Sequence, residues 1–95
     1  MFTTVESSLS GRGFAPSGEA RIYFECRGDG EETVVLSHGL GGTHAVWYQQ
    51  VLALARTHHV VTWDQRGFGK STDPQDTAGP AAAVEDLHSL LDHIG

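Results

Sequence analysis

Two short apolar runs separated by a helical pattern constrain the fold of this chain more than any other feature. Residues 33–37 read TVVLS and residues 59–63 read HVVTW, and both runs are rich in the β-branched residues typical of strands. Between them Trp47, Val51 and Leu54, with the adjacent Ala55, recur at helical spacing. Strand, helix and strand within about thirty residues form a βαβ unit. This unit predicts two parallel strands joined by a right-handed crossover.

A further strand is predicted at residues 20–27, where apolar and polar residues alternate. Ile22, Phe24 and Cys26 are expected on one face, and Arg21, Tyr23, Glu25 and Arg27 on the other. This strand is therefore expected to be half-exposed, with a turn after it at residues 28–30. The almost unbroken apolar run at 33–37 suits instead a strand that is buried on both faces of a parallel sheet.

The secondary-structure pattern is weak at the N-terminal end of the chain and clear at the C-terminal end. Residues 1–18 show one possible short strand at 3–7, followed by a loop rich in Gly, Pro and Ser. At the other end a helix is predicted to begin near Pro80 and to close with Gly95 as its C-cap. The buried stripe of that helix is expected to hold Val84, Leu87, Leu91 and Ile94. Thr43 is placed to cap the middle helix.

Length and charge restrict the class of protein. The 95 residues suffice for one small domain, and 6 basic against 12 acidic residues give a formal net charge of −6. Such a balance argues against nucleic acid as a partner. No apolar run is long enough to span a membrane and the start of the chain lacks the features of a signal peptide, so a cytoplasmic protein is expected. The single cysteine, Cys26, is interpreted as a small core residue.

The stretch GFGKST at residues 67–72 suggests a nucleotide-binding P-loop, but it fails two tests. A P-loop needs a glycine five residues before its Gly-Lys pair, and Asp64 occupies that position. It also needs a helix immediately after the lysine, where this chain has STDPQDTAGP. A metal site is equally disfavoured, because Glu85 and His88 form only one Glu-x-x-His pair and a di-iron site needs two.

Both glycine-rich stretches follow predicted strands, and in an open parallel sheet such loops meet where ligands bind. They read His38-Gly39-Leu40 and, at 64–71, Asp-Gln-Arg-Gly-Phe-Gly-Lys-Ser. With these motifs the chain resembles the α/β-hydrolase family from about residue 20 to 95. The resemblance implies that residues 1–95 are the N-terminal portion of one such domain, with a mostly parallel sheet, an N-terminal antiparallel strand and the later strands lacking. It also implies strand order 1-2-4-3-5, which leaves the 33–37 strand without one neighbour.

The resemblance assigns the loop after residue 37 to the stabilisation of an oxyanion. The backbone N–H of Leu40 is the implied donor, and Gly39, Gly41 and Gly42 allow the backbone to turn its amides toward a substrate. His38 is implied to be a scaffold whose ring hydrogen-bonds neighbouring backbone, not a general base. A plain flexible loop is the alternative.

The second motif is implied to hold this oxyanion loop in place. Asp64 and Arg66 are expected to reach one another or nearby carbonyls, with a purely surface pair as the alternative, and Gly67 and Gly69 complete the motif. Ser71 lies in the frame G-K-S-T-D, which lacks the second glycine of a nucleophile elbow. It is therefore interpreted as a turn residue that hydrogen-bonds its own loop.

Nucleophile, acid and histidine of such a hydrolase have no place in residues 1–95, so the chain alone is expected to be inactive. It is also expected to self-associate, because the apolar 33–37 strand has an open edge. Its parent is expected to hydrolyse a small-molecule ester, lactone or related carbonyl substrate without a cofactor. Two alternatives stay open. One is a short non-catalytic interaction module on the same scaffold. The other is a relative of epoxide hydrolases or dehalogenases with an aspartate nucleophile.

Overall fold

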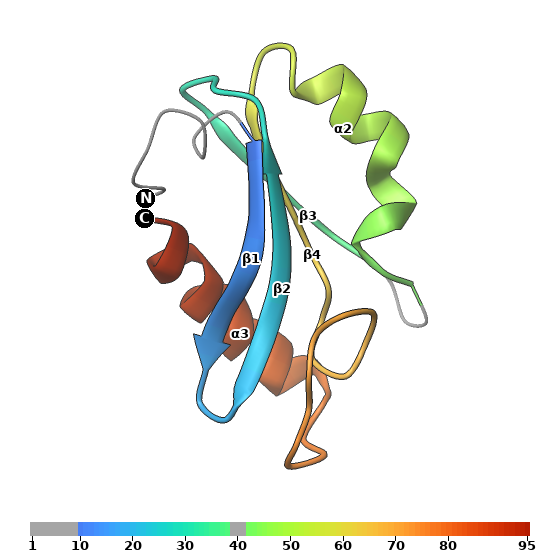
Figure 1. Ribbon diagram of the computed structural model, residues 1–95, viewed down its shortest axis with the longest axis vertical. Helices are drawn as coiled ribbons and strands as arrows, with labels where there is room; N and C mark the ends of the chain where they lie inside the picture. The colour runs from blue at the N-terminus through green and yellow to red at the C-terminus, as the bar shows by residue number, and fades with distance from the viewer. Residues whose placement is uncertain (1–9, 39–41) are drawn as a thin grey trace.

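The strands expected at 20–27, 33–37 and 59–63 are present with those bounds in the computed structural model, which describes residues 10–38 and 42–95. In chain order the elements are β1 (Ser10–Ser17), β2 (Ala20–Arg27), β3 (Thr33–Ser37), the 3₁₀ helix η1 (His44–Trp47), α2 (Tyr48–Leu54), β4 (His59–Trp63) and α3 (Pro80–Ile94). Figure 1 shows α3 crossing behind the hairpin of β1 and β2.

The described strands form one mixed sheet in the order β1-β2-β4-β3. β3 and β4 are parallel, which confirms the βαβ unit, while β2 is antiparallel to both of its neighbours. β2 therefore runs against the other three strands, and β3 lies at an edge of the described sheet. This order of the described strands agrees with the order 1-2-4-3 that the resemblance implied for them.

β1 corrects the prediction of a loop before Gly18; the strand expected at 3–7 lies outside the described residues. Ser10 to Ser17 pair along their whole length with β2 in antiparallel register. The glycines that suggested a loop fit here because Gly13 lies against the ring of Phe24. Pro16 is tolerated because β1 lies at an edge of the described sheet. Gly18, with φ +57°, makes the tight turn into β2.

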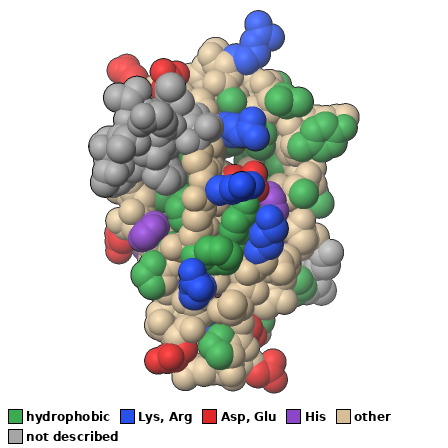
Figure 2. Space-filling view, in the orientation of Figure 1, with side chains coloured by type: hydrophobic (Ala, Val, Ile, Leu, Met, Phe, Trp, Pro, Cys, Tyr) green, Lys and Arg blue, Asp and Glu red, His purple; other side chains and the backbone are tan. Residues whose placement is uncertain are grey.

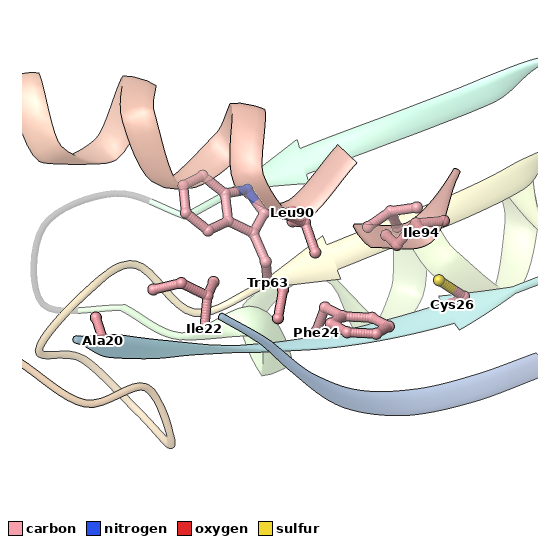
Figure 3. Packing of buried hydrophobic residues seen from close by; sticks show 9 residues of the cluster. Ala20, Ile22, Phe24, Cys26, Trp63, Leu90 and Ile94 are labelled. Carbon is pink, nitrogen blue, oxygen red and sulfur yellow. The ribbon is translucent and has the colours of Figure 1, made fainter. Parts of the chain in front are cut away.

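The core lies between the sheet and α3. Figure 3 shows Ile94 of α3 above Phe24 and Leu90 beside the indole ring of Trp63. The same cluster contains Ile22, Cys26, Ala15, Ala20 and Val61. Full burial of a Leu or Phe side chain contributes about 1.5–3 kcal/mol. Val60 and Thr62, which alternate with the core residues of β4, face the opposite side and lie beside Val51 of α2. The two helices thus cover opposite faces of the sheet.

The buried stripe of α3 differs from the prediction. Asp86, Leu90 and Ile94 are buried, with Ala83 and Leu87 packed partly against the core. Val84 and Leu91 are instead 62% and 40% exposed. The helix is rotated because Asp86 is drawn into the interior by Arg66, with which it forms an ion pair. Gly95 does close the helix, and its N–H donates to the carbonyl of Leu91 at 3.0 Å.

Two further expectations of burial need correction. β3 is only half-buried and not covered on both faces, because it lies at the sheet edge; the more buried strand is β4. Tyr23 does belong to the outward face of β2 but is only 3% exposed, because Phe14 and Lys70 cover its ring. Thr43 caps the middle helix as expected, accepting from the N–H of Ala45, although the first turn is 3₁₀.

Within the described residues, no helix combines the length and the apolar character that crossing a bilayer requires.

Candidate functional site

The two loops singled out by the sequence lie at the same edge of the sheet, because β3 and β4 are parallel and each loop follows one of them. The structure describes His38 and residues 42–44 of the first loop and all of the second. Gly39, Leu40 and Gly41 lie outside the described residues. The described part of the site consists of the residues on both sides of this short stretch and of the second loop.

His38 fixes one border of the stretch to the second loop. Its side chain is 3% exposed, and its Nε2 accepts a hydrogen bond from the backbone N–H of Gln65 at 2.9 Å. The side-chain amide of Gln65 donates in return to the carbonyl of His38 at 2.6 Å. Phe68 packs edge-on against the imidazole with ring centroids 5.8 Å apart. Because Nε2 accepts, the ring proton of His38 lies on Nδ1.

Asp64 fixes the other border. Its fully buried carboxylate accepts from the backbone N–H of His44, from His44 Nδ1 at 2.8 Å and from the backbone N–H of Lys70 at 2.9 Å. Burial by itself raises the pKa of Asp64, but these hydrogen bonds and the neighbouring imidazole outweigh it and hold the pKa below its ordinary value. Asp64 is thus a charged anchor between the two loops.

His44 is a residue of this site that sequence reasoning missed. Its ring lies between two carboxylates, with Nδ1 on Asp64 at 2.8 Å and Nε2 on Glu25 Oε2 at 3.0 Å. Tyr23 packs beside the imidazole at 5.0 Å and donates its hydroxyl proton to Glu25 at 2.6 Å. Burial, and next the hydrogen bond to Glu25, raise the pKa of Tyr23 to about 12. The outward position of Glu25 in the alternating strand was the only available signal for this cluster.

The contacts of Gly69 explain why the second motif has a glycine at this position. Gly69 has φ +52°, and a Cβ atom added there would lie 2.3 Å from Oδ2 of Asp64. Only glycine lets the backbone come this close to the carboxylate, so that the N–H of Lys70 can reach it. Gly67, with φ +81°, also has the left-handed conformation that favours glycine.

Ser71 makes hydrogen bonds of the kind expected for a turn residue. Its Oγ donates to the carbonyl of Asp64 at 2.6 Å and accepts from the backbone N–H of Tyr23 at 2.8 Å. The hydroxyl thereby ties the second loop both to itself and to β2. Both contacts hold the Ser71 hydroxyl against backbone groups.

Arg66 does not pair with Asp64, but its Nη2 donates to the backbone carbonyl of Ser17 at 3.5 Å, which is the other arrangement expected for it. Its guanidinium binds Asp86 of α3 through two hydrogen bonds, Nε to Oδ2 at 3.0 Å and Nη2 to Oδ1 at 2.6 Å. Nη1 donates to Thr77 at 2.7 Å. Both Arg66 and Asp64 are buried, so the alternative of a surface pair is wrong. Arg66 connects the second loop to α3, whereas Asp64 connects it to the first loop.

These residues offer anchoring and hydrogen-bond geometry rather than a metal centre. Among residues 10–38 and 42–95, no group of three or more His, Cys, Asp and Glu side chains is placed to hold a metal ion.

A pocket of about 420 Å³ opens beside the second loop and the start of α3, lined by Gln65, Arg66, Phe68, Ala78, Gly79, Pro80 and Ala83.

Known proteins are similar to this chain in sequence, and solved structures are similar to it in architecture. The family model described as "alpha/beta hydrolase fold" matches residues 32–95. A putative carbamate hydrolase RutD from Rhizobium rhizogenes is 39% identical over 70 residues, which are 70% of this chain and 27% of that protein.

Solved structures agree with the sequence matches. The bromoperoxidase from Bacillus anthracis has a TM-score of 0.81 and 36% identity, covering 88% of this chain and 31% of that one. The epoxide hydrolase CorEH has a TM-score of 0.82 and 26% identity, covering 90% and 30%. The chain thus spans about a third or less of the length of these proteins. Because the family model matches more than half of it, the chain belongs to the α/β-hydrolase fold family.

Proposed function

We propose that this chain supplies the oxyanion loop, and the scaffold that holds it, of a hydrolase acting on an ester, a lactone or a related carbonyl substrate. The observation that carries the proposal is that both borders of residues 39–43 are tied to adjacent residues of the second loop. His38 binds Gln65 on one side, and His44 binds Asp64 on the other. A short segment fixed in this way can present a backbone N–H at a defined position, as oxyanion stabilisation requires.

In this proposal the backbone N–H of Leu40 is the oxyanion donor, and His38, Gly39, Gly41, Asp64, Arg66, Gly67, Gly69 and Ser71 form the supporting loops. One such donor contributes about 2.7–4 kcal/mol to transition-state stabilisation. Nucleophile, acid and base are proposed to lie in sequence outside residues 1–95. The resemblance to a putative carbamate hydrolase supports a carbonyl substrate, since a carbamate is cleaved at its carbonyl carbon.

The experiment uses the complete protein that contains this chain and a panel of p-nitrophenyl esters, lactones and carbamates. Leu40→Pro removes the N–H, and kcat is expected to fall by about 10²–10³-fold. Leu40→Ala keeps the N–H and is the matched control, expected to stay within about threefold. Equal losses in both variants would refute the donor role of Leu40. A wild-type protein that is inactive on the whole panel would refute hydrolysis of a carbonyl substrate.

The likeness to an epoxide hydrolase supports one second candidate, in which an aspartate nucleophile opens an epoxide. A fluorophosphonate probe distinguishes the two, because it labels an activated serine. Labelling together with ester turnover supports the first proposal. Epoxide turnover without labelling supports the second.

A further inference from the structure

Basic side chains gather on one surface of this acidic chain. Figure 2 shows blue side chains following one another over the β1–β2 hairpin. The register places Arg12 of β1 opposite Glu25, on the same outward face of the hairpin as Arg21 and Arg27 of β2. We call Arg12, Arg21, Arg27 and the neighbouring Lys70 the cationic face; all four are exposed. They are four of the six Lys and Arg residues in a chain of net charge −6.

The side chains of the cationic face are not held in ion pairs within the described residues. None of the ion pairs found among residues 10–38 and 42–95 includes any of the four. Glu25 lies on the same face but is engaged by the hydroxyl of Tyr23 and by the ring of His44. The remaining basic residues lie elsewhere: Arg66 is buried against Asp86, and Arg56 follows α2.

Aromatic rings hold two of these cations in place. The guanidinium of Arg21 lies 4.6 Å from the ring centroid of Phe14, and Nζ of Lys70 lies 4.7 Å from that of Tyr23. The two rings pack edge to face with centroids 5.4 Å apart. A cation supported on a ring face loses less side-chain entropy when a partner binds. The face is therefore pre-organised for an anionic partner.

We propose that the cationic face binds an acidic segment of another polypeptide in extended conformation. Residues on one face of a strand recur every ~6.6–6.8 Å, so Arg21 and Arg27 lie about 20 Å apart along β2. An extended segment with acids at alternate positions has the same repeat. Arginine and aromatic residues together are also the composition typical of protein interfaces.

Two other anionic partners fit the cationic face less well. A nucleic acid would be repelled by the rest of a chain with twice as many acidic as basic residues. An anionic membrane would favour apolar side chains that can insert, whereas Phe14 is only 37% exposed and Tyr23 only 3%. Charge complementarity therefore favours the polypeptide.

The test measures fluorescence anisotropy of a labelled peptide of alternating Glu and Ser, titrated with the complete protein that contains this chain. Binding is expected at about 20 mM salt and should weaken strongly at about 150 mM. Arg21→Glu is expected to weaken the binding roughly tenfold, because it replaces an attraction with a repulsion. Arg56→Glu changes the net charge by the same amount outside the cationic face and should change the affinity by less than about twofold. Arg21→Gln, a milder change, should lie between wild type and Arg21→Glu.

Three outcomes would overturn the proposal. The first is absence of binding at low salt, and the second is an equal effect of Arg21→Glu and Arg56→Glu. The third is a higher affinity for single-stranded oligothymidine or for phosphatidylserine vesicles than for the peptide. Circular dichroism of each variant ensures that weaker binding is not caused by unfolding.

Discussion

Gly69 and Asp64 show how a single residue type can be required for a reason unrelated to a ligand. The carboxylate of Asp64 occupies the space that a side chain on Gly69 would fill, with Oδ2 only 2.3 Å from the position of a Cβ atom. The glycine therefore lets the N–H of Lys70 donate to Asp64 at 2.9 Å. The GFGKS stretch binds a carboxylate of its own chain where a P-loop would bind phosphate.

A pair of alanine substitutions separates backbone strain from this close approach. Gly18 and Gly69 have nearly the same left-handed φ, +57° and +52°, but a Cβ on Gly18 would meet nothing within 4 Å. Gly18→Ala should therefore lower the free energy of unfolding by about 1–2 kcal/mol, the cost of left-handed backbone alone. Gly69→Ala should cost about 1–3 kcal/mol more, because the buried carboxylate loses hydrogen bonds. Urea unfolding measures both; equal losses would contradict the close approach.

At this scale the sequence predicted roles that depend on neighbours in the chain better than roles that depend on distant ones. Ser71 bonds to its own loop, as a turn residue in that position should. Arg66, however, bonds to Asp86, twenty residues away on a helix whose rotation could not be read from apolar spacing. His44 was missed because its significance arises only when β2 brings Glu25 beside it.

At the scale of elements, the orientation of α3 depends on a buried charge as well as on its apolar residues. Asp86 is fully buried and bound twice by Arg66, and Ser17 donates to it at 2.7 Å. Those contacts join the β1–β2 turn, the loop after β4 and α3. The predicted stripe through Val84 and Leu91 was wrong because apolar spacing alone cannot place an acidic residue such as Asp86 in the interior.

Removing one member of this ion pair should be more harmful than removing both. Arg66→Met leaves the Asp86 carboxylate buried without its partner, which should cost about 3–5 kcal/mol of unfolding free energy. Arg66→Met combined with Asp86→Leu should recover at least about half of that loss, since no uncompensated charge stays in the interior. Arg56→Met, at an exposed arginine, is the control and should stay within about 0.5 kcal/mol of wild type. A double variant no more stable than Arg66→Met would show that the uncompensated Asp86 carboxylate is not the cause of the loss.

For the molecule as a whole, the sheet order explains why β3 is less buried than its composition predicts. Val34, Val35 and Leu36 are only half-buried, because β4 pairs with one side of β3 and no described strand pairs with the other. The strand order was anticipated from the family motifs, while the strand at Ser10–Ser17 was not. A strand rich in glycine with a proline has weak local preference, and its pairing with β2 determines its conformation.

The unpaired side of β3 leads to a prediction about association of the 95-residue chain. An apolar edge strand presents free N–H and C=O groups that a second copy can pair with. The weight-average sedimentation coefficient should therefore rise with protein concentration between about 10 and 100 µM. Val34→Lys places a charge on the edge strand and should make the coefficient nearly independent of concentration. Thr57→Lys adds the same charge at an exposed position after α2 and should associate like wild type. A wild-type chain that stays monomeric over the whole concentration range would contradict the prediction. Equal dissociation of both lysine variants would show that the chain does not associate through β3.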